Sequence, residues 1–222
     1  MEIYPIQSNT LKRFGSQQGA AAYAAKFESQ WVERIRNGHE QRLVNDFLSM
    51  IPASDFSGFV LDMPCGFGRF LPSLREFAPR VVEGDWSGSM LEIVRSRHPG
   101  MAPEMVRSSA TTLPFASRSF SLVFSVRLCH HIQTFEQRLE YLREIQRVSE
   151  RWIIFTYLDE HSCHNAVRSR LRRWKGKRAT WGMSADEVAG VFASGGFQVV
   201  RTELLSKLLS SQRYTLLRRN GR

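Results

Sequence analysis

The sequence predicts an α/β protein in which an open, mostly parallel sheet follows a group of N-terminal helices. After Pro52, short apolar runs alternate with amphipathic stretches, as they do in strand–helix–strand units around a sheet that is buried on both faces. The region before Pro52 differs, because strong helix formers and apolar residues at helical spacing fill it. These two patterns together define the fold class.

Each element is expected from a local pattern. The alanine-rich stretch at 20–27 and the later apolar positions predict two N-terminal helices, which Gly38 separates. Strands are expected at Phe59–Leu61, Val81-Val82, Met105-Val106, Phe120–Phe124 and Trp152–Phe155. Helices are expected at Arg69–Phe77, Ser87–Arg97 and Phe135–Val148. A capping box at Ser184–Glu187 opens a last helix, which Gly195-Gly196 ends, and segments 197–205 and 212–219 are expected to form a hairpin.

Composition excludes several classes of protein. With 222 residues and 42% hydrophobic residues, the chain has enough apolar material for a core, which argues against disorder. No apolar run approaches the roughly 20 residues that cross a bilayer, and no signal peptide is visible at the N-terminus. Three cysteines are too few for a disulfide framework, so a cytoplasmic location is expected. The net charge of +10 favours polyanionic partners.

The most informative motif follows the first expected strand. That strand ends at Asp62, a turn with Gly66 and Gly68 follows, and a helix begins beyond it. Glycines allow a ligand to approach the backbone, and a helix N-terminus offers free N–H groups to an anion. The second strand ends at Asp85, where an acid can accept hydrogen bonds from ribose hydroxyls. Both features indicate a cofactor that contains a nucleoside.

The pattern departs from the dinucleotide-binding fingerprint, because Leu71 occupies the place of the third glycine. It resembles instead the class I S-adenosylmethionine-dependent methyltransferases, close to the ubiquinone/menaquinone C-methyltransferase group (methyltransferase type 11). Four blocks within residues 20–219 carry the resemblance: 60–69 (VLDMPCGFGR), 84–91 (GDWSGSML), 110–115 (ATTLPF) and 120–131, which ends in His130-His131. The resemblance implies a three-layer, Rossmann-like αβα fold with seven strands, of which the last is antiparallel. It also implies S-adenosylmethionine as cofactor, S-adenosylhomocysteine as product, and no metal.

The resemblance assigns cofactor contacts residue by residue. The loop would hold the methionine part near Asp62, Asp85 would bind the ribose, and Trp86 and Met90 would pack on the adenosine. The full set of implied cofactor positions is Asp62, Pro64, Cys65, Gly66, Gly68, Asp85, Trp86, Met90, Ser109, Ala110 and Ser125. Pro64, Ser109 and Ser121 depart from the residues usual in the family, which leaves open a weakened cofactor site.

Several residues are candidates for work on the acceptor. His130 and His131 are candidate general bases, and a packing role for the pair is the alternative. The candidate acceptor-binding residues are Tyr23, Arg127, Tyr157, Arg168 and Arg172. Tyr23 and Lys26 could also close over the site, and plain helix packing is the alternative for Tyr23. His161, Cys163 and His164 have no second Cys/His cluster to complete a zinc site.

The segment 168–178 carries seven positive charges and no acid. An anionic acceptor, RNA or an acidic membrane surface could bind it, and a solvated basic face is the alternative. We expect one domain, with a helical lid at 1–52 and a core at 53–222 that contains a basic insertion at 160–183. The expected function is methyl transfer to a small, anionic or lipid-like acceptor. The alternatives are an RNA-modifying methyltransferase and a non-catalytic basic interaction module with a degenerate methyltransferase fold.

Overall fold

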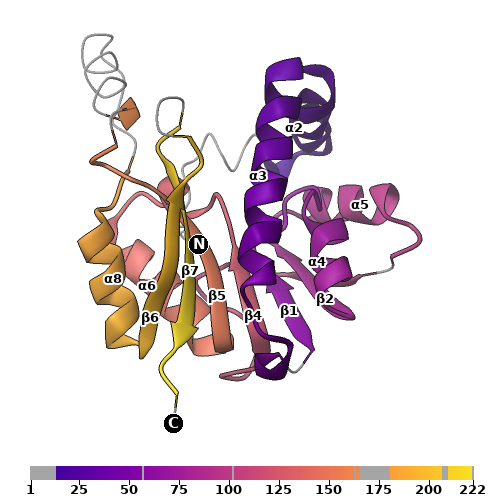
Figure 1. Cartoon of the computed structure of the whole chain (residues 1–222). Coiled ribbons are helices and arrows are strands. Elements are labelled where there is room, and N and C mark those ends of the chain that lie inside the picture. Colours follow the sequence, from indigo (N-terminus) through magenta and orange to yellow (C-terminus); the bar gives the residue numbers. More distant parts are fainter. Residues whose placement is uncertain are drawn as a thin grey trace.

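The computed structural model describes residues 14–221 except 57, 102, 163, 166–180 and 207–209. Seven strands form one sheet in the order β3-β2-β1-β4-β5-β7-β6 (Figure 1). The strands are β1 (Phe59–Asp62), β2 (Arg80–Asp85), β3 (Glu104–Arg107), β4 (Phe120–Ser125), β5 (Ser149–Leu158), β6 (Phe197–Leu204) and β7 (Gln212–Arg219). The neighbouring strands from β3 through β2, β1 and β4 to β5 are all parallel, and β7 runs antiparallel to both β5 and β6. The predicted sheet, including its antiparallel last strand, is therefore confirmed.

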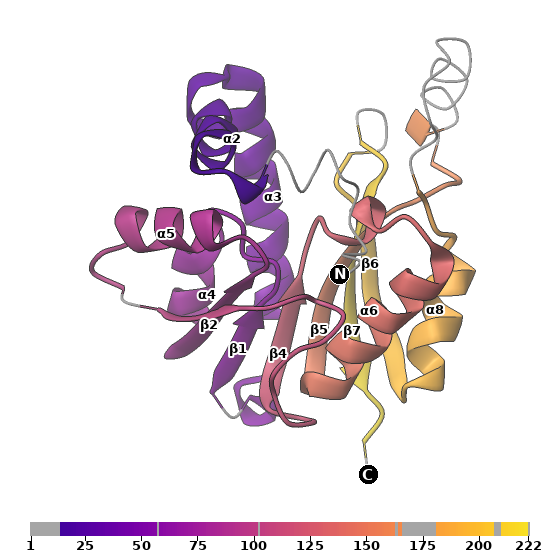
Figure 2. The same cartoon turned by 180° about the vertical axis from the view of Figure 1, so that it is seen from behind.

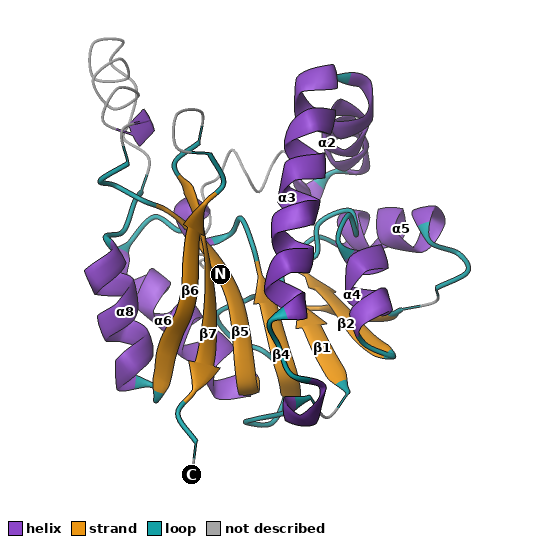
Figure 3. Ribbon diagram, viewed as in Figure 1, coloured by secondary structure: helices purple, strands orange, loops and turns teal. Residues whose placement is uncertain are grey.

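Helices cover both faces of the sheet, which gives three layers (Figures 1 and 2). The helices are α2 (Gln17–Ser29), α3 (Trp31–Ser49), α4 (Leu71–Phe77), α5 (Gly88–Arg97), α6 (Phe135–Val148) and α8 (Ala185–Ser194). One core lies between the sheet and α3, α4 and α5, and it includes Phe47, Leu74 and Val94. A second core lies on the other face, beneath α6 and α8, and it includes Tyr141 and Phe192. Figure 3 shows the helices on either side of the strands.

The expectation that Gly38 separates the N-terminal helices is wrong. Helix α3 continues through Gly38, and the break lies at Gln30, whose backbone is extended with φ −93° and ψ 116°. A glycine inside a helix costs only about 1 kcal/mol relative to alanine. The second half of α3 offsets that cost, because Leu43, Val44 and Phe47 are fully or almost fully buried against the sheet.

The other predicted elements are confirmed with small shifts at their ends. The capping box at α8 is present, since the Ser184 hydroxyl accepts a hydrogen bond from the Glu187 N–H at 3.1 Å and the Glu187 carboxylate accepts one from the Ser184 N–H at 2.8 Å. Segment 168–178, with Arg168 and Arg172, lies outside the described residues. Among the helices that are described, none has the length and apolar character needed to cross a membrane.

Candidate functional site

A tight loop connects β1 to α4 and leaves the C-terminal edge of the sheet. Gly66 and Gly68 have φ values of +57° and +73°, which glycine adopts more readily than residues with a side chain. The Met63–Pro64 peptide bond is cis. The loop is tied to β2, because the Cys65 N–H donates to the Gly84 carbonyl at 2.8 Å. A Cβ at Gly84 would lie 2.7 Å from the Met63 sulfur, so the strand and loop pack without room for a side chain.

Three buried acids meet behind this loop. Asp62, the last residue of β1, is the register partner of Glu83 inside β2, and Asp85 ends β2 two residues later. Asp85 supports the loop, since its carboxylate accepts hydrogen bonds from the N–H groups of Gly66 at 2.9 Å and Ser87 at 2.8 Å. Sequence reasoning did not single out Glu83. The sequence feature that could have identified Glu83 is an acid inside an otherwise apolar strand.

All three carboxyl groups of this cluster have raised pKa values. Burial, helped by the charges of Glu83 and Asp85, raises the pKa of Asp62 well above its ordinary value. Burial also raises the pKa of Glu83 to about 8 and that of Asp85 to about 6, although backbone N–H groups oppose the rise at Asp85. Both carboxylate oxygens of Asp62 are buried and have no hydrogen-bond partner among the described residues. A buried carboxylate in this state is stabilised by a cation or by hydrogen-bond donors.

These residues fit the cofactor that the family resemblance implies. S-adenosylmethionine carries an ammonium group and a sulfonium, and Asp62 offers a buried acceptor without a partner beside a glycine loop. The Asp85 carboxylate retains lone pairs beyond those used by Gly66 and Ser87. The predicted contacts at Asp62, Gly66, Gly68 and Asp85 therefore lie together at one edge of the sheet.

Helix α2 covers the loop and the start of α5 (Figures 1 and 2). Ala20 and Ala24 are buried in a small cluster with Phe67 and Met90, against which Tyr23 also packs. The rings of Tyr23 and Phe67 meet edge to face, with centroids 5.9 Å apart. Tyr23 therefore packs against Phe67 of the loop, and its role toward the acceptor stays a prediction.

The segment before α2 also reaches the predicted adenosine side of the site. The Ser87 hydroxyl donates a hydrogen bond to the Phe14 carbonyl. A Cβ at Gly15 would lie 3.3 Å from the Trp86 ring. Trp86 and Met90, the residues implied to pack on adenosine, thus contact the N-terminal part of the chain.

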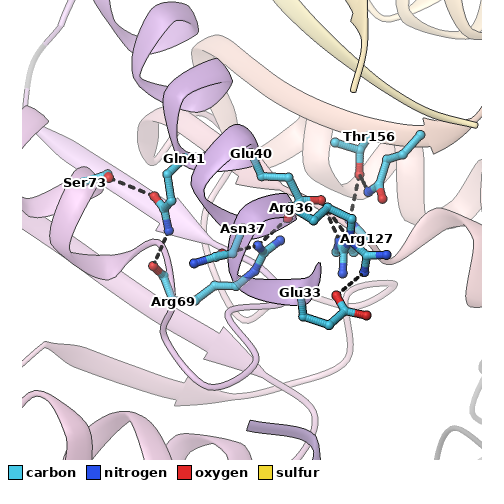
Figure 4. Close-up of polar contacts among 10 residues, drawn as sticks. Glu33, Arg36, Asn37, Glu40, Gln41, Arg69, Ser73, Arg127 and Thr156 are labelled. Carbon is cyan, nitrogen blue, oxygen red and sulfur yellow. Dashed lines mark hydrogen bonds and ion pairs between the residues drawn. The ribbon is translucent and has the colours of Figure 1, made fainter. Parts of the chain in front are cut away.

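A buried ion network joins α3 to the site (Figure 4). Glu40, which is fully buried, pairs with Arg69 from the loop and with Arg127 from the end of β4. The Arg127 side chain donates to one Glu40 oxygen from Nε at 3.1 Å and from Nη2 at 2.8 Å. Burial would raise the pKa of Glu40, but Arg69 and Arg127 hold it below its ordinary value. Neither Glu40 nor Arg69 was a predicted functional position, because no local pattern indicates pairs so far apart in sequence.

Arg127 was predicted to bind the acceptor, and the structure brings it close to Tyr23. The two side chains interact, and Glu40 is the main opposite charge beside the guanidinium. The Arg127 backbone has φ +63°, and its N–H donates to the Thr156 hydroxyl at 2.7 Å. The conformation of Arg127 is therefore held from both its backbone and its side chain.

The histidine pair lies on a short turn, Cys129–His131, directly after Arg127-Leu128. Both imidazoles are partly exposed, and their ring centroids are 4.2 Å apart. This location at the C-terminal edge of the sheet is compatible with either proposed role of the pair, proton transfer or packing.

The remaining predicted positions, Ser125, Ser109, Ala110 and Tyr157, mainly contact other parts of the fold. The buried Ser125 hydroxyl donates to the Met63 carbonyl and shares a hydrogen bond of 2.6 Å with Tyr141. Ser109 shares a hydrogen bond of 2.8 Å with Thr111, and Ala110 beside it is buried. Tyr157 is 2% exposed and stacks on Phe155, so it belongs mainly to the core. In the described part of the chain, no three His, Cys, Asp or Glu side chains are grouped as metal ligands.

Comparisons with known proteins agree with this geometry. Residues 61–151 match the family model of the methyltransferase domain, type 11. A probable tRNA methyltransferase 9B from Mus musculus is 29% identical over 89 residues, which cover 40% of this chain and 19% of that protein. A tRNA (carboxymethyluridine(34)-5-O)-methyltransferase from Xenopus tropicalis is 28% identical over 105 residues, 47% of this chain and 15% of that protein. The matched segments thus span less than a fifth of the length of these curated relatives.

Solved structures share the fold over almost the whole chain. The magnesium protoporphyrin IX methyltransferase of Synechocystis with bound S-adenosylhomocysteine has a TM-score of 0.80 at 16% identity, covering 96% of this chain and 100% of that one. A putative methyltransferase from Haloferax volcanii, in complex with a methyltransferase activator, has a TM-score of 0.70 at 16% identity and covers 95% and 98% of the two chains. Residues 61–151 therefore match a methyltransferase domain, and the chain around them has the fold of S-adenosylmethionine-dependent methyltransferases.

Proposed function

We propose that the chain transfers a methyl group from S-adenosylmethionine to a small, anionic or lipid-like acceptor. The observation that carries the proposal is the Asp62 carboxylate, buried and without a partner among the described residues, behind a loop of positive-φ glycines. Such a group is suited to a ligand with an ammonium and a sulfonium. The same observation argues against a non-catalytic module, because a degenerate site has no reason to retain a buried acid that costs stability.

The cofactor, when bound, supplies a methyl group that its positive sulfur has already activated. Asp62 would hold the ammonium, Asp85 would accept from the ribose hydroxyls, and α2 would exclude water above the loop. The bound cofactor would give its methyl group to a lone pair of the acceptor atom and would leave as S-adenosylhomocysteine. Where the acceptor is a hydroxyl or a carbon acid, its proton passes to an imidazole nitrogen of His130 or His131.

Tyr23 and Arg127 form the proposed boundary of the acceptor site. Arg127 is partly exposed on its outer side and Tyr23 lies beside it. The guanidinium can donate to a carboxylate or phosphate while it keeps its bonds to Glu40, because it has five N–H donors. Support for an acceptor of this class comes from the Synechocystis neighbour, whose named acceptor is magnesium protoporphyrin IX.

A second candidate is methylation of RNA. The curated relatives that match this chain are named as tRNA methyltransferases, and segment 168–178 carries seven positive charges. RNA binding would require affinity to fall steeply with salt, because each neutralised phosphate releases counterions.

Calorimetric titration with S-adenosylhomocysteine tests the cofactor site. We expect micromolar binding by the parent protein and at least tenfold weaker binding by Asp62→Asn, because an amide cannot neutralise the ammonium. Glu92→Gln, an exposed acid on α5, is the matched control and should bind like the parent. No measurable heat with the parent protein would favour the interaction module.

The acceptor is then tested with labelled S-adenosylmethionine. Transfer of the label to small metabolites, lost in Arg127→Gln at an unchanged cofactor affinity, supports the small acceptor. Transfer of the label to tRNA, with an activity that falls steeply as the salt concentration rises, would instead support methylation of RNA.

A further inference from the structure

A concave pocket lies at the opposite edge of the sheet from the glycine loop. It is lined by the turn before β4, the last turns of α6 and α8, and the end of β7, and its volume is about 370 Å³. These parts of the chain meet at the lower edge of the sheet in Figure 1. Small-molecule sites usually have volumes of about 300–1,000 Å³, so the space is sufficient for a small ligand.

The lining is strongly and one-sidedly basic. Four arginines contribute to it, Arg118, Arg143, Arg147 and Arg219, and no Asp or Glu does. The positive charge of Arg147 is balanced by Glu144, which does not line the pocket. Glu144 accepts hydrogen bonds from Arg147 Nη2 at 2.7 Å and from Nε at 2.8 Å. In the described part of the structure, the exposed Arg118 and Arg143 have no ion-pair partner. Surplus positive charge therefore remains at the pocket.

Arg219 makes the wall of the pocket rigid. Its guanidinium donates to four backbone carbonyls: Glu150 at 3.0 Å, Gly195 at 3.1 Å, Gln146 at 2.7 Å and Ser149 at 2.8 Å. These bonds join the ends of α6 and α8 to β7. Burial first, and then the charge of Arg118, lowers the pKa of Arg219. The two guanidinium groups are thus close enough to repel each other.

Gln146 lines the same pocket and is 5% exposed. Its Nε2 donates to the Leu142 carbonyl at 3.0 Å, and its buried Oε1 lies against Gly195, where an added Cβ would be only 1.7 Å away. The charge available to a ligand in this pocket therefore comes from the arginines, and such a ligand needs negative charge.

We propose that this pocket is a second binding site, for the phosphoryl group of a small phosphorylated molecule, separate from the methyl-transfer site. A phosphate monoester carries about −1.5 to −2 charges at pH 7. Its anionic oxygens accept hydrogen bonds from Arg118 and Arg143. A carboxylate that is ionised at pH 7 brings only a single negative charge to these arginines.

Titration with inorganic pyrophosphate, with ionic strength held constant, tests the site. The variants are Arg118→Gln and Arg143→Gln, and the matched control is Arg95→Gln, an exposed arginine on α5 at the other edge of the sheet. We expect saturable binding by the parent protein, a loss of affinity of about fivefold or more in each pocket variant, and parental affinity in the control. Binding of S-adenosylhomocysteine should be the same in all four proteins, which verifies folding and keeps the result independent of the proposed methyl transfer.

Other outcomes would overturn the proposal. Equal weakening in the pocket variants and in Arg95→Gln would mean general attraction by a basic protein. Absence of pyrophosphate binding by the parent protein would exclude the small anion. If a single-stranded RNA oligonucleotide bound through Arg118 and pyrophosphate did not, the pocket would be part of a nucleic-acid surface instead.

Discussion

At the proposed cofactor site, the charge state of Asp62 decides how well a cationic ligand binds. Asp62 lies at 1% exposure among two other buried acids. In the free protein the raised pKa favours the protonated form of this carboxyl, whereas an ammonium ligand favours the charged form. Ligand binding and proton release are therefore coupled at this residue.

The first prediction follows from that coupling. We expect binding of S-adenosylhomocysteine to release a proton and its affinity to weaken as the pH falls from 8 to 6, by up to about tenfold per pH unit if one proton is involved. Calorimetry in two buffers with different ionisation enthalpies measures the proton directly. In Asp62→Asn the released fraction should drop. An affinity that is constant with pH would show that the acids are already ionised in the free protein.

Glu83 provides a second prediction, about stability. Its pKa rises from 4.5 in the unfolded chain to about 8 in the folded protein. Between those values the folded state holds a proton that the unfolded state has lost, so this residue makes the free energy of unfolding fall as the pH rises through that window. We expect Glu83→Gln to be more stable than the parent by about 1–3 kcal/mol at pH 8 and equal to it near pH 4. Urea unfolding at both pH values measures the difference, and a loss of stability at pH 8 would contradict it.

At the scale of elements, α3 connects the sheet to the glycine loop through ion pairs. Its first half carries Glu33, which pairs with Lys26 of α2 at 3.2 Å, and its middle carries Glu40, which pairs with Arg69 and Arg127. Through these pairs one helix fixes α2, the loop and the exit of β4 relative to one another. The solvent-facing side of α3 carries large apolar residues instead of ion pairs, since Trp31 and Ile35 are 71% and 63% exposed.

The third prediction tests the ion pairs of Glu40 on α3. Glu40→Gln leaves two largely buried guanidinium groups without their carboxylate, which should lower the free energy of unfolding by about 3–5 kcal/mol. Glu104→Gln is the control, because its pair with Arg80 is exposed on both sides and should be worth at most about 1 kcal/mol. Chemical denaturation compares the two variants. Comparable losses in both would show that the Glu40 network carries no special energy.

The sequence predicted the fold of the whole molecule well and the site only in part. Strands such as β4 and β5 are read from contiguous apolar runs, and the α8 boundary from a capping box, because these features are local. Glu40 and Arg127 are 87 residues apart, and no spacing rule pairs them. The position of the break at Gln30 also depends on tertiary packing. Arg118, Arg143 and Arg219 join in one pocket only because the strand order brings three distant segments together.

The strand order leads to a fourth prediction. β7 has partners on both sides, and Leu216 within it is completely buried. Leu216→Ala should lower the free energy of unfolding by about 2–5 kcal/mol. Val199→Ala on β6 should cost less than about 1 kcal/mol, because that side chain is 40% exposed. Equal losses in the two variants would mean that β7 is not a central strand in solution.

The position of β7 also constrains how the chain folds during synthesis. The ribosome makes β7 after β5 and β6, yet β7 lies between them in the sheet. Until residues 212–219 have left the exit tunnel, β5 presents an open edge and β6 has no partner strand. Unpaired strand edges of this kind promote aggregation of nascent chains. The β5–β7–β6 part of the sheet can therefore form only after β7 has been made, whereas the strands on either side of the glycine loop can pair earlier.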